Sequence, residues 1–113
     1  MSNEPFLQIR DKMVERVKRT LAYCEGVDRE TFMRQTMLQE ACVFNVLQVG
    51  ELAAKAIERG YDQVAADIPW RQMRGMRNRI VHDYEGVRLD TVWDAIQSDF
   101  PALLGILEGN HQA

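Results

Sequence analysis

Apolar side chains recur at steps of three and four residues through almost the whole chain, and this spacing constrains the fold more than any other feature. The step matches the 3.6-residue period of an α-helix, whereas a half-buried β-strand would alternate every second residue. The first such stretch spans 4–25 and has charged residues on its opposite face. Asn3 as a cap, Pro5 in the first turn and Gly26 as a stop fit this helix. The spacing therefore predicts an all-α chain.

A second helical pattern starts near Asp28 and can continue to Arg59, with Gly60 behind it. A helix of that length would span roughly 45–50 Å. That is more than a compact chain of 113 residues needs. We therefore expect either a break near Phe32–Thr36 or a second subunit along the side of this helix.

The middle of this segment, Ala41–Ile57, is apolar nearly all round, which is typical of a helix that is buried on most sides. Its few polar residues fall within about a third of the helix circumference. Two interpretations of this polar stripe stay open. It can be a solvated edge, or it can line a wet cleft opposite a basic helix, with Glu51 orienting an arginine and Gln48 in support. The stripe consists of Asn45, Gln48, Glu51 and Lys55.

Two further helices are predicted downstream. One runs from Pro69 to about Val81, and Pro69 fits its start because a missing N–H costs little there. The other begins near Leu89 or Asp90, and we expect a kink or short break just before Pro101. The expected core residues are Trp70, Met73, Met76 and Ile80 in the former, and Leu89, Val92, Trp93, Ile96, Phe100, Leu103 and Leu107 in the latter.

The composition is that of an ordinary globular protein, with 46% hydrophobic and 27% charged residues. We expect one helical domain spanning 1–113, large enough to bury a core without disulfide bonds or a structural metal ion. The two cysteines, Cys24 and Cys42, sit inside helical patterns, so reduced, buried thiols in a cytoplasmic protein are expected, and a disulfide between the helices is the alternative. No signal-peptide pattern and no apolar run of membrane-spanning length are present, so no membrane association is expected.

The segment Ile68–His82 is strongly basic in an otherwise acidic chain. It contains four arginines and no carboxylate, whereas the whole chain has a net charge of −3. An isolated basic patch with a titratable histidine suggests that a polyanion is bound there. Arginine can hold phosphate oxygens and stabilise transition-state charge, and histidine can transfer protons near neutral pH. The patch therefore indicates phosphodiester cleavage, with Arg77 and His82 as the reacting groups.

The residues from Arg77 to Tyr84 form the pattern R-x-x-x-x-H-x-Y, with His82 as its histidine and Asn78 directly after the first arginine. This pattern resembles the signature of the HEPN superfamily, and more narrowly that of the HepT toxins of bacterial and archaeal toxin–antitoxin pairs. The likeness covers most of the chain in the expected order. Val49-Gly50-Glu51-Leu52-Ala53 is similar to the glycine–glutamate element of the family's long helix, Ile68-Pro69-Trp70 to the approach to the motif, and Val92-Trp93 with Phe100-Pro101-Ala102-Leu103 to the final helix.

The resemblance implies an antiparallel bundle of four to five helices that forms a homodimer, with two copies of the motif facing one another across one cleft. It implies a metal-independent endoribonuclease toxin that acts on RNA through Arg77, His82 and Asn78. It also implies a partner, the minimal nucleotidyltransferase antitoxin MntA, which transfers AMP from ATP onto Tyr84. The added charge and bulk would switch the toxin off.

The site residues have plainer interpretations as well. His82 can cap or pack a helix end, and Arg77 can be a surface arginine paired with Asp83 or Glu85. The remaining arginines of the patch can contact the RNA backbone or simply cover a solvated helix face. These arginines are Arg71, Arg74 and Arg79.

Geometry places a condition on the pair. Arg77 and His82 lie five residues apart, so on one regular helix their side chains point about 140° apart. The helix must distort or end before His82, or the two groups must meet across a subunit interface.

The alternative function is a non-catalytic helical module that binds and serves a nucleotidyltransferase. No cofactor is expected, and no metal site either, because the two histidines are far apart and no carboxylates cluster near the motif.

Overall fold

The computed structural model describes residues 4–82 and 88–109, and every regular element in these ranges is helical. The predicted all-α fold is confirmed. The elements in chain order are α1 (Glu4–Tyr23), α2 (Arg29–Phe32), α3 (Thr36–Glu58), the 3-10 turn η1 (Tyr61–Gln63), α4 (Trp70–His82), α5 (Leu89–Asp94), the π-helical turn η3 (Ala95–Asp99) and α6 (Phe100–Gly109).

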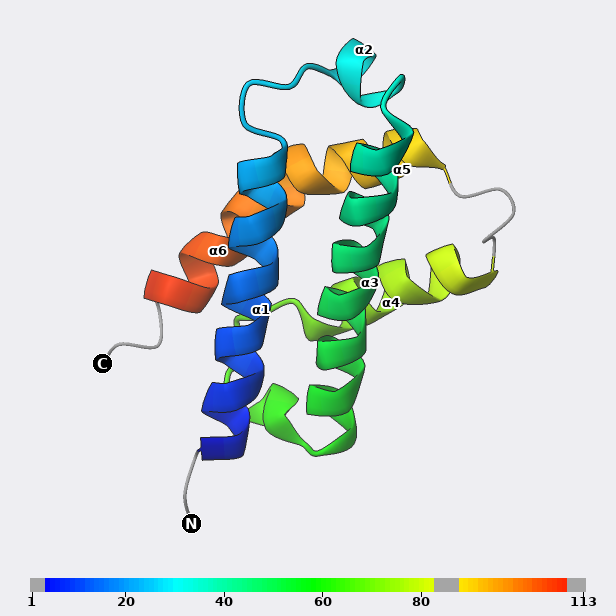
Figure 1. Cartoon of the computed structure of the whole chain (residues 1–113). Helices are drawn as coiled ribbons and strands as arrows, with labels where there is room; N and C mark the ends of the chain where they lie inside the picture. The colour runs from blue at the N-terminus through cyan, green and yellow to red at the C-terminus, as the bar shows by residue number, and fades with distance from the viewer. Residues whose placement is uncertain (1–3, 83–87, 110–113) are drawn as a thin grey trace.

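The helix α3 is the central element of the bundle. It lies beside α1 and runs in the opposite direction, while α4 crosses behind it (Figure 1). The helix α6 passes behind α1 in the view of Figure 1 and packs against it. Because α3 contacts both α1 and α4 extensively, it determines how α4 is placed. In the described part of the chain, no helix combines the length and apolar character needed to cross a membrane.

The first helix ends at Tyr23, earlier than the predicted Glu25. Cys24, which was expected inside this helix, therefore lies in the turn that follows it. The chain reverses through Gly26, whose φ of +73° is the left-handed conformation that glycine adopts readily. Asn3, the expected cap of this helix, lies outside the described residues.

The predicted 28–59 helix is broken where expected. The side chain of Asp28 accepts a hydrogen bond from the backbone N–H of Thr31 at 2.8 Å and so caps α2. The helix α2 ends at Phe32, whose buried ring lies 5.0 Å from the ring centre of Trp93 in α5. A new helix, α3, starts at Thr36.

The helix α4 is held at its first residue. The buried indole of Trp70 donates a hydrogen bond from Nε1 to the carbonyl of Ala65 at 2.9 Å, so the approach loop and the helix start are joined. The predicted apolar face of this helix is buried throughout, as Met73, Met76 and Ile80 follow Trp70 in the core. The predicted apolar face of this helix is confirmed.

The last helical segment is interrupted before Pro101, as predicted. Proline has no N–H to offer the carbonyl of Gln97, and its ring crowds that carbonyl. The backbone responds by widening into the π-helical turn η3, Ala95–Asp99, rather than by breaking. The helix thus continues into α6, and Phe100, Leu103 and Leu107 remain in the core.

Candidate functional site

The basic segment forms most of α4, which has no acidic residue in its first turn. Its apolar face is buried, so its polar residues occupy the remaining surface. Arg71, Asn78 and His82 are all exposed. They share the outward face of α4, because steps of seven and four residues return to nearly the same side of a helix.

Arg77 lies on the flank of α4 that faces α3. Its Nε atom is 3.3 Å from Oε1 of Glu51, with side-chain exposures of 24% and 56% for the two residues. The contact falls outside hydrogen-bond geometry, and Nε is buried without a hydrogen-bond partner among the described residues. The pair is therefore an electrostatic contact. Asp83 and Glu85, the other partners considered for Arg77, lie outside the described residues.

Sequence reasoning did not anticipate how closely Gly50 approaches Arg77. A Cβ atom added to Gly50 would lie 2.3 Å from Cβ of Arg77, which is too close for two non-bonded carbons. A signal was present, because a glycine inside a helix lowers its stability by about 1 kcal/mol relative to alanine. Such a glycine commonly marks a close packing contact.

The polar stripe of α3 does not form a single surface, so neither interpretation of it holds as a whole. Asn45 is only 2% exposed, and its Oδ1 accepts a hydrogen bond from Arg16 Nη1 of α1 at 3.1 Å. Glu51 contacts α4 on the opposite flank, Gln48 is half-buried and Lys55 is exposed. The stripe is thus divided between two neighbouring helices and solvent.

His82 is the last residue of α4 and is exposed. The expectation that the helix could end before His82 is wrong, because α4 is α-helical from Trp70 through His82. On a regular helix Arg77 and His82 point about 140° apart, so within one chain they do not converge. Tyr84 lies outside the described residues.

The other arginines of the patch lie on or beside the same outward face. Nη2 of Arg71 lies 3.5 Å from Oδ2 of Asp62, in a largely exposed ion pair of the kind that contributes little to stability. Arg74 is half-buried, and Arg79 is exposed on the side of α4 remote from Arg77. This broad cationic surface can contact an extended polyanion at several points.

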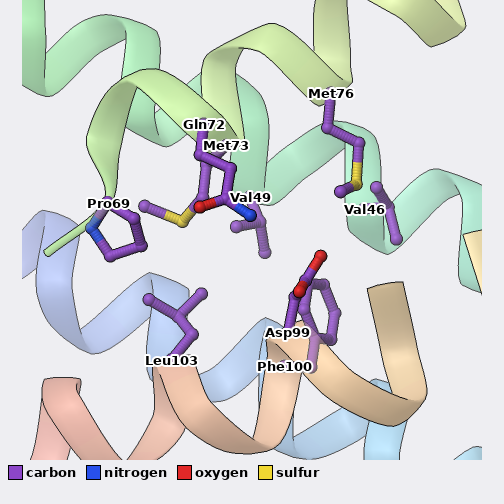
Figure 2. Close-up of a pocket in the computed structure, with 9 residues that line it drawn as sticks. All are labelled: Val46, Val49, Pro69, Gln72, Met73, Met76, Asp99, Phe100 and Leu103. Atoms are coloured by element: carbon purple, nitrogen blue, oxygen red, sulfur yellow. The ribbon is translucent and has the colours of Figure 1, made fainter. Parts of the chain in front are cut away.

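A small cavity lies directly beneath this surface, between α3, α4 and α6. Its volume is about 30 Å³, room for a water molecule or two and far too little for a nucleotide. Figure 2 shows the carboxylate of Asp99 pointing across it toward α4. Across residues 4–82 and 88–109, no three His, Cys, Asp or Glu side chains gather as metal ligands would. The exposed surface of α4 is therefore the candidate site.

The profile of the family described as Ribonuclease HepT-like matches residues 13–109, which include all of α3 and α4. The chain belongs to the HepT-like family. The family membership expected from the motif is confirmed, and the match extends from α1 to α6.

Individual relatives support the same conclusion for this HepT-like chain. A candidate RNase of Caldanaerobacter subterraneus subsp. tengcongensis is 30% identical over 100 residues, covering 88% of this chain and 82% of the relative. A candidate ribonuclease HepT of Thermococcus cleftensis is 28% identical, covering 84% of this chain and 89% of the relative. A candidate RNase of Methanocaldococcus jannaschii is 23% identical, covering 80% and 83%. No solved structure matches the chain significantly.

Proposed function

We propose that this HepT-like chain is a metal-independent endoribonuclease, the toxin of a toxin–antitoxin pair that acts on RNA in the cytoplasm. The observation that carries the proposal is the arrangement on α4. Arg77 is held against α3, and His82 is exposed on the same basic helix. The names of the relatives, two candidate RNases and a candidate ribonuclease HepT, agree with it.

A homodimer would bring the reacting groups together. Arg77 and His82 point away from one another on the regular helix α4, so the Arg77 of one copy needs the His82 of another to form a compact site. A two-fold axis near the end of α4 would place the two motifs opposite one another in one composite cleft. In that arrangement each RNA phosphate meets an arginine and a histidine from different copies.

The reaction is attack of a ribose 2′-hydroxyl on its own phosphate. The new O–P bond forms as the bond to the 5′-oxygen of the next nucleotide breaks, which leaves a 2′,3′-cyclic phosphate. Arg77 stabilises the extra negative charge of the phosphorane with its remaining N–H groups. His82 removes the hydroxyl proton or delivers one to the leaving oxygen. Asn78, on the outward face beside His82, donates to a phosphate oxygen or holds the geometry of the pair.

Control is proposed to act at Tyr84 through an MntA-like nucleotidyltransferase antitoxin. Transfer of AMP from ATP joins the phenol oxygen to the α-phosphate and releases pyrophosphate. The new phosphodiester adds negative charge beside Arg77 and the exposed arginines of α4, where it competes with RNA. The tyrosine follows His82 by two residues, so the added adenosine would also crowd the cleft.

The experiment is RNA cleavage by the purified chain in EDTA, with wild type compared with His82→Ala. We expect cleavage of an RNA strand, survival of the same sequence as DNA, and a rate for His82→Ala lower by on the order of a hundredfold or more. Arg29→Ala, an exposed arginine on α2, is the matched control and should cleave like wild type. Loss of activity in EDTA, or equal cleavage of DNA, would contradict the mechanism. An inactive wild type that still binds the nucleotidyltransferase would favour the non-catalytic module.

A further inference from the structure

The helices α3 and α4 approach one another closely at the root of the Arg77 side chain. An added Cβ at Gly50 would meet Cβ of Arg77 at 2.3 Å, Cγ of Arg77 at 3.0 Å and the carbonyl oxygen of Met73 at 3.0 Å. Two of these three atoms are the first two side-chain carbons of Arg77, and the third is a backbone oxygen of α4. None is the far end of a flexible chain, so a methyl group at Gly50 must push α4 or Arg77 away.

The neighbouring residue of α3 reaches the other end of the same side chain. Oε1 of Glu51 lies 3.3 Å from Nε of Arg77, and that nitrogen is shielded from solvent. A guanidinium carries five N–H donors, of which one belongs to Nε and four to the terminal nitrogens. A carboxylate beside Nε therefore leaves the four terminal N–H groups for another anion.

We propose that Gly50 and Glu51 are positioning residues for Arg77, Gly50 by allowing α4 to approach and Glu51 by holding the guanidinium. The proposal rests on the proposed ribonuclease function of Arg77. A free arginine side chain loses considerable rotamer freedom when it is ordered around a phosphate. An arginine that is already ordered by its own protein loses less, and misplacement of a catalytic group by about 1 Å can reduce a rate about a hundredfold.

Two other glycines provide matched controls. A Cβ at Gly75, on α4 itself, would meet nothing closer than Nη1 of Arg79 at 3.9 Å, and a Cβ at Gly105 of α6 would meet nothing within 4 Å. Alanine at either position fits without displacement and should raise helix stability. The pair Gly50→Ala and Gly75→Ala thus separates the effect of a methyl group at the helix crossing from that of any glycine replacement.

The first test is RNA cleavage by these variants. We expect Gly50→Ala to lower kcat at least tenfold with a smaller change in KM, and Gly75→Ala to match wild type. Arg77→Ala should then reduce the rate much less in the Gly50→Ala background than in wild type, because the arginine is already misplaced there. Equal effects of Arg77→Ala in both backgrounds, or full activity of Gly50→Ala, would overturn the role of Gly50.

The second test needs neither activity nor a successful Gly50→Ala fold. Nitrogen-15 NMR can observe the Nε–H group of Arg77, assigned by its loss in Arg77→Lys. We expect a sharp Nε–H signal in wild type and in Gly75→Ala, and a shifted or broadened one in Glu51→Gln. A signal unchanged by Glu51→Gln would overturn the role of Glu51. A wild type that fails to cleave RNA while this NMR response is present would refute the ribonuclease and leave the positioning intact.

Discussion

The Sγ atoms of Cys24 and Cys42 lie 3.6 Å apart, which joins the turn after α1 to the buried side of α3. Both thiols are free and buried, with Cys24 6% exposed and Cys42 fully enclosed. Burial, together with the hydrogen bond to the Cys24 thiol, raises the pKa of Cys42 to about 12. Burial also raises the pKa of Cys24, partly offset by the hydrogen bond to Cys42. The pair is thus a packed, protonated contact in the folded chain.

This contact predicts a loss of stability at alkaline pH. A thiol whose pKa is higher in the folded chain than in the unfolded chain stabilises the fold while it is protonated in both states. As pH rises above the ordinary value of 9.0, the unfolded chain loses its proton first, so the free energy of unfolding falls toward pH 12. Urea unfolding between pH 7 and pH 11 measures this. Cys42→Ala should flatten the pH dependence, and an equally steep fall in that variant would contradict the assignment.

We predict a homodimer at micromolar concentration. Met37 and Phe44 of α3 are 86% and 51% exposed, and Val81, within the motif on α4, is 49% exposed, so both helices carry exposed apolar side chains. The orientation of Arg77 and His82 also predicts a dimer, because their side chains point about 140° apart on α4 and can meet only across two copies. Light scattering should return twice the 13.1 kDa mass of the chain. A monomer mass at micromolar concentration would count decisively against the composite site.

The salt dependence of RNA binding should report how many of the exposed arginines contact phosphates. For single-stranded RNA, each lost phosphate contact reduces the slope of log affinity against log salt by about 0.7. Arg71→Ala and Arg79→Ala should each weaken binding of the catalytically silent His82→Ala chain, with little change between RNA sequences. Arg29→Ala on α2 is the control. If both α4 variants show the same slope of log affinity against log salt as His82→Ala alone, Arg71 and Arg79 do not contact phosphates and only cover a solvated helix face.

Modification at Tyr84 is predicted to be the basis of control. Intact-protein mass spectrometry after incubation with a nucleotidyltransferase partner and ATP should detect a mass gain in whole AMP units. Tyr84→Phe removes only the hydroxyl, so it should lose this gain, keep much of the cleavage activity and escape enzymatic neutralisation. The same mass gain in Tyr84→Phe would move the acceptor elsewhere and leave the cleavage proposal standing.

Local pattern predicted most of the secondary structure of this chain. The break after Phe32, the turns through Gly26 and Gly60, and the interruption before Pro101 follow from the properties of single residues or short runs. The buried face of α4 was also predictable, because apolar residues at helical spacing must face the core. The candidate site residues were found through the motif, since a basic run with one histidine is unusual in an acidic chain.

Only the tertiary structure decided which helix each polar side chain meets. Asn45 and Glu51 belong to the same stripe of α3, yet Asn45 binds Arg16 of α1 and Glu51 contacts Arg77 of α4. Periodicity along one helix determines which side is apolar, but it carries no information about which neighbour approaches each flank. The place of Arg77 depends on the missing Cβ of Gly50. That contact joins residues far apart in the chain, and it exists only after α3 and α4 have crossed.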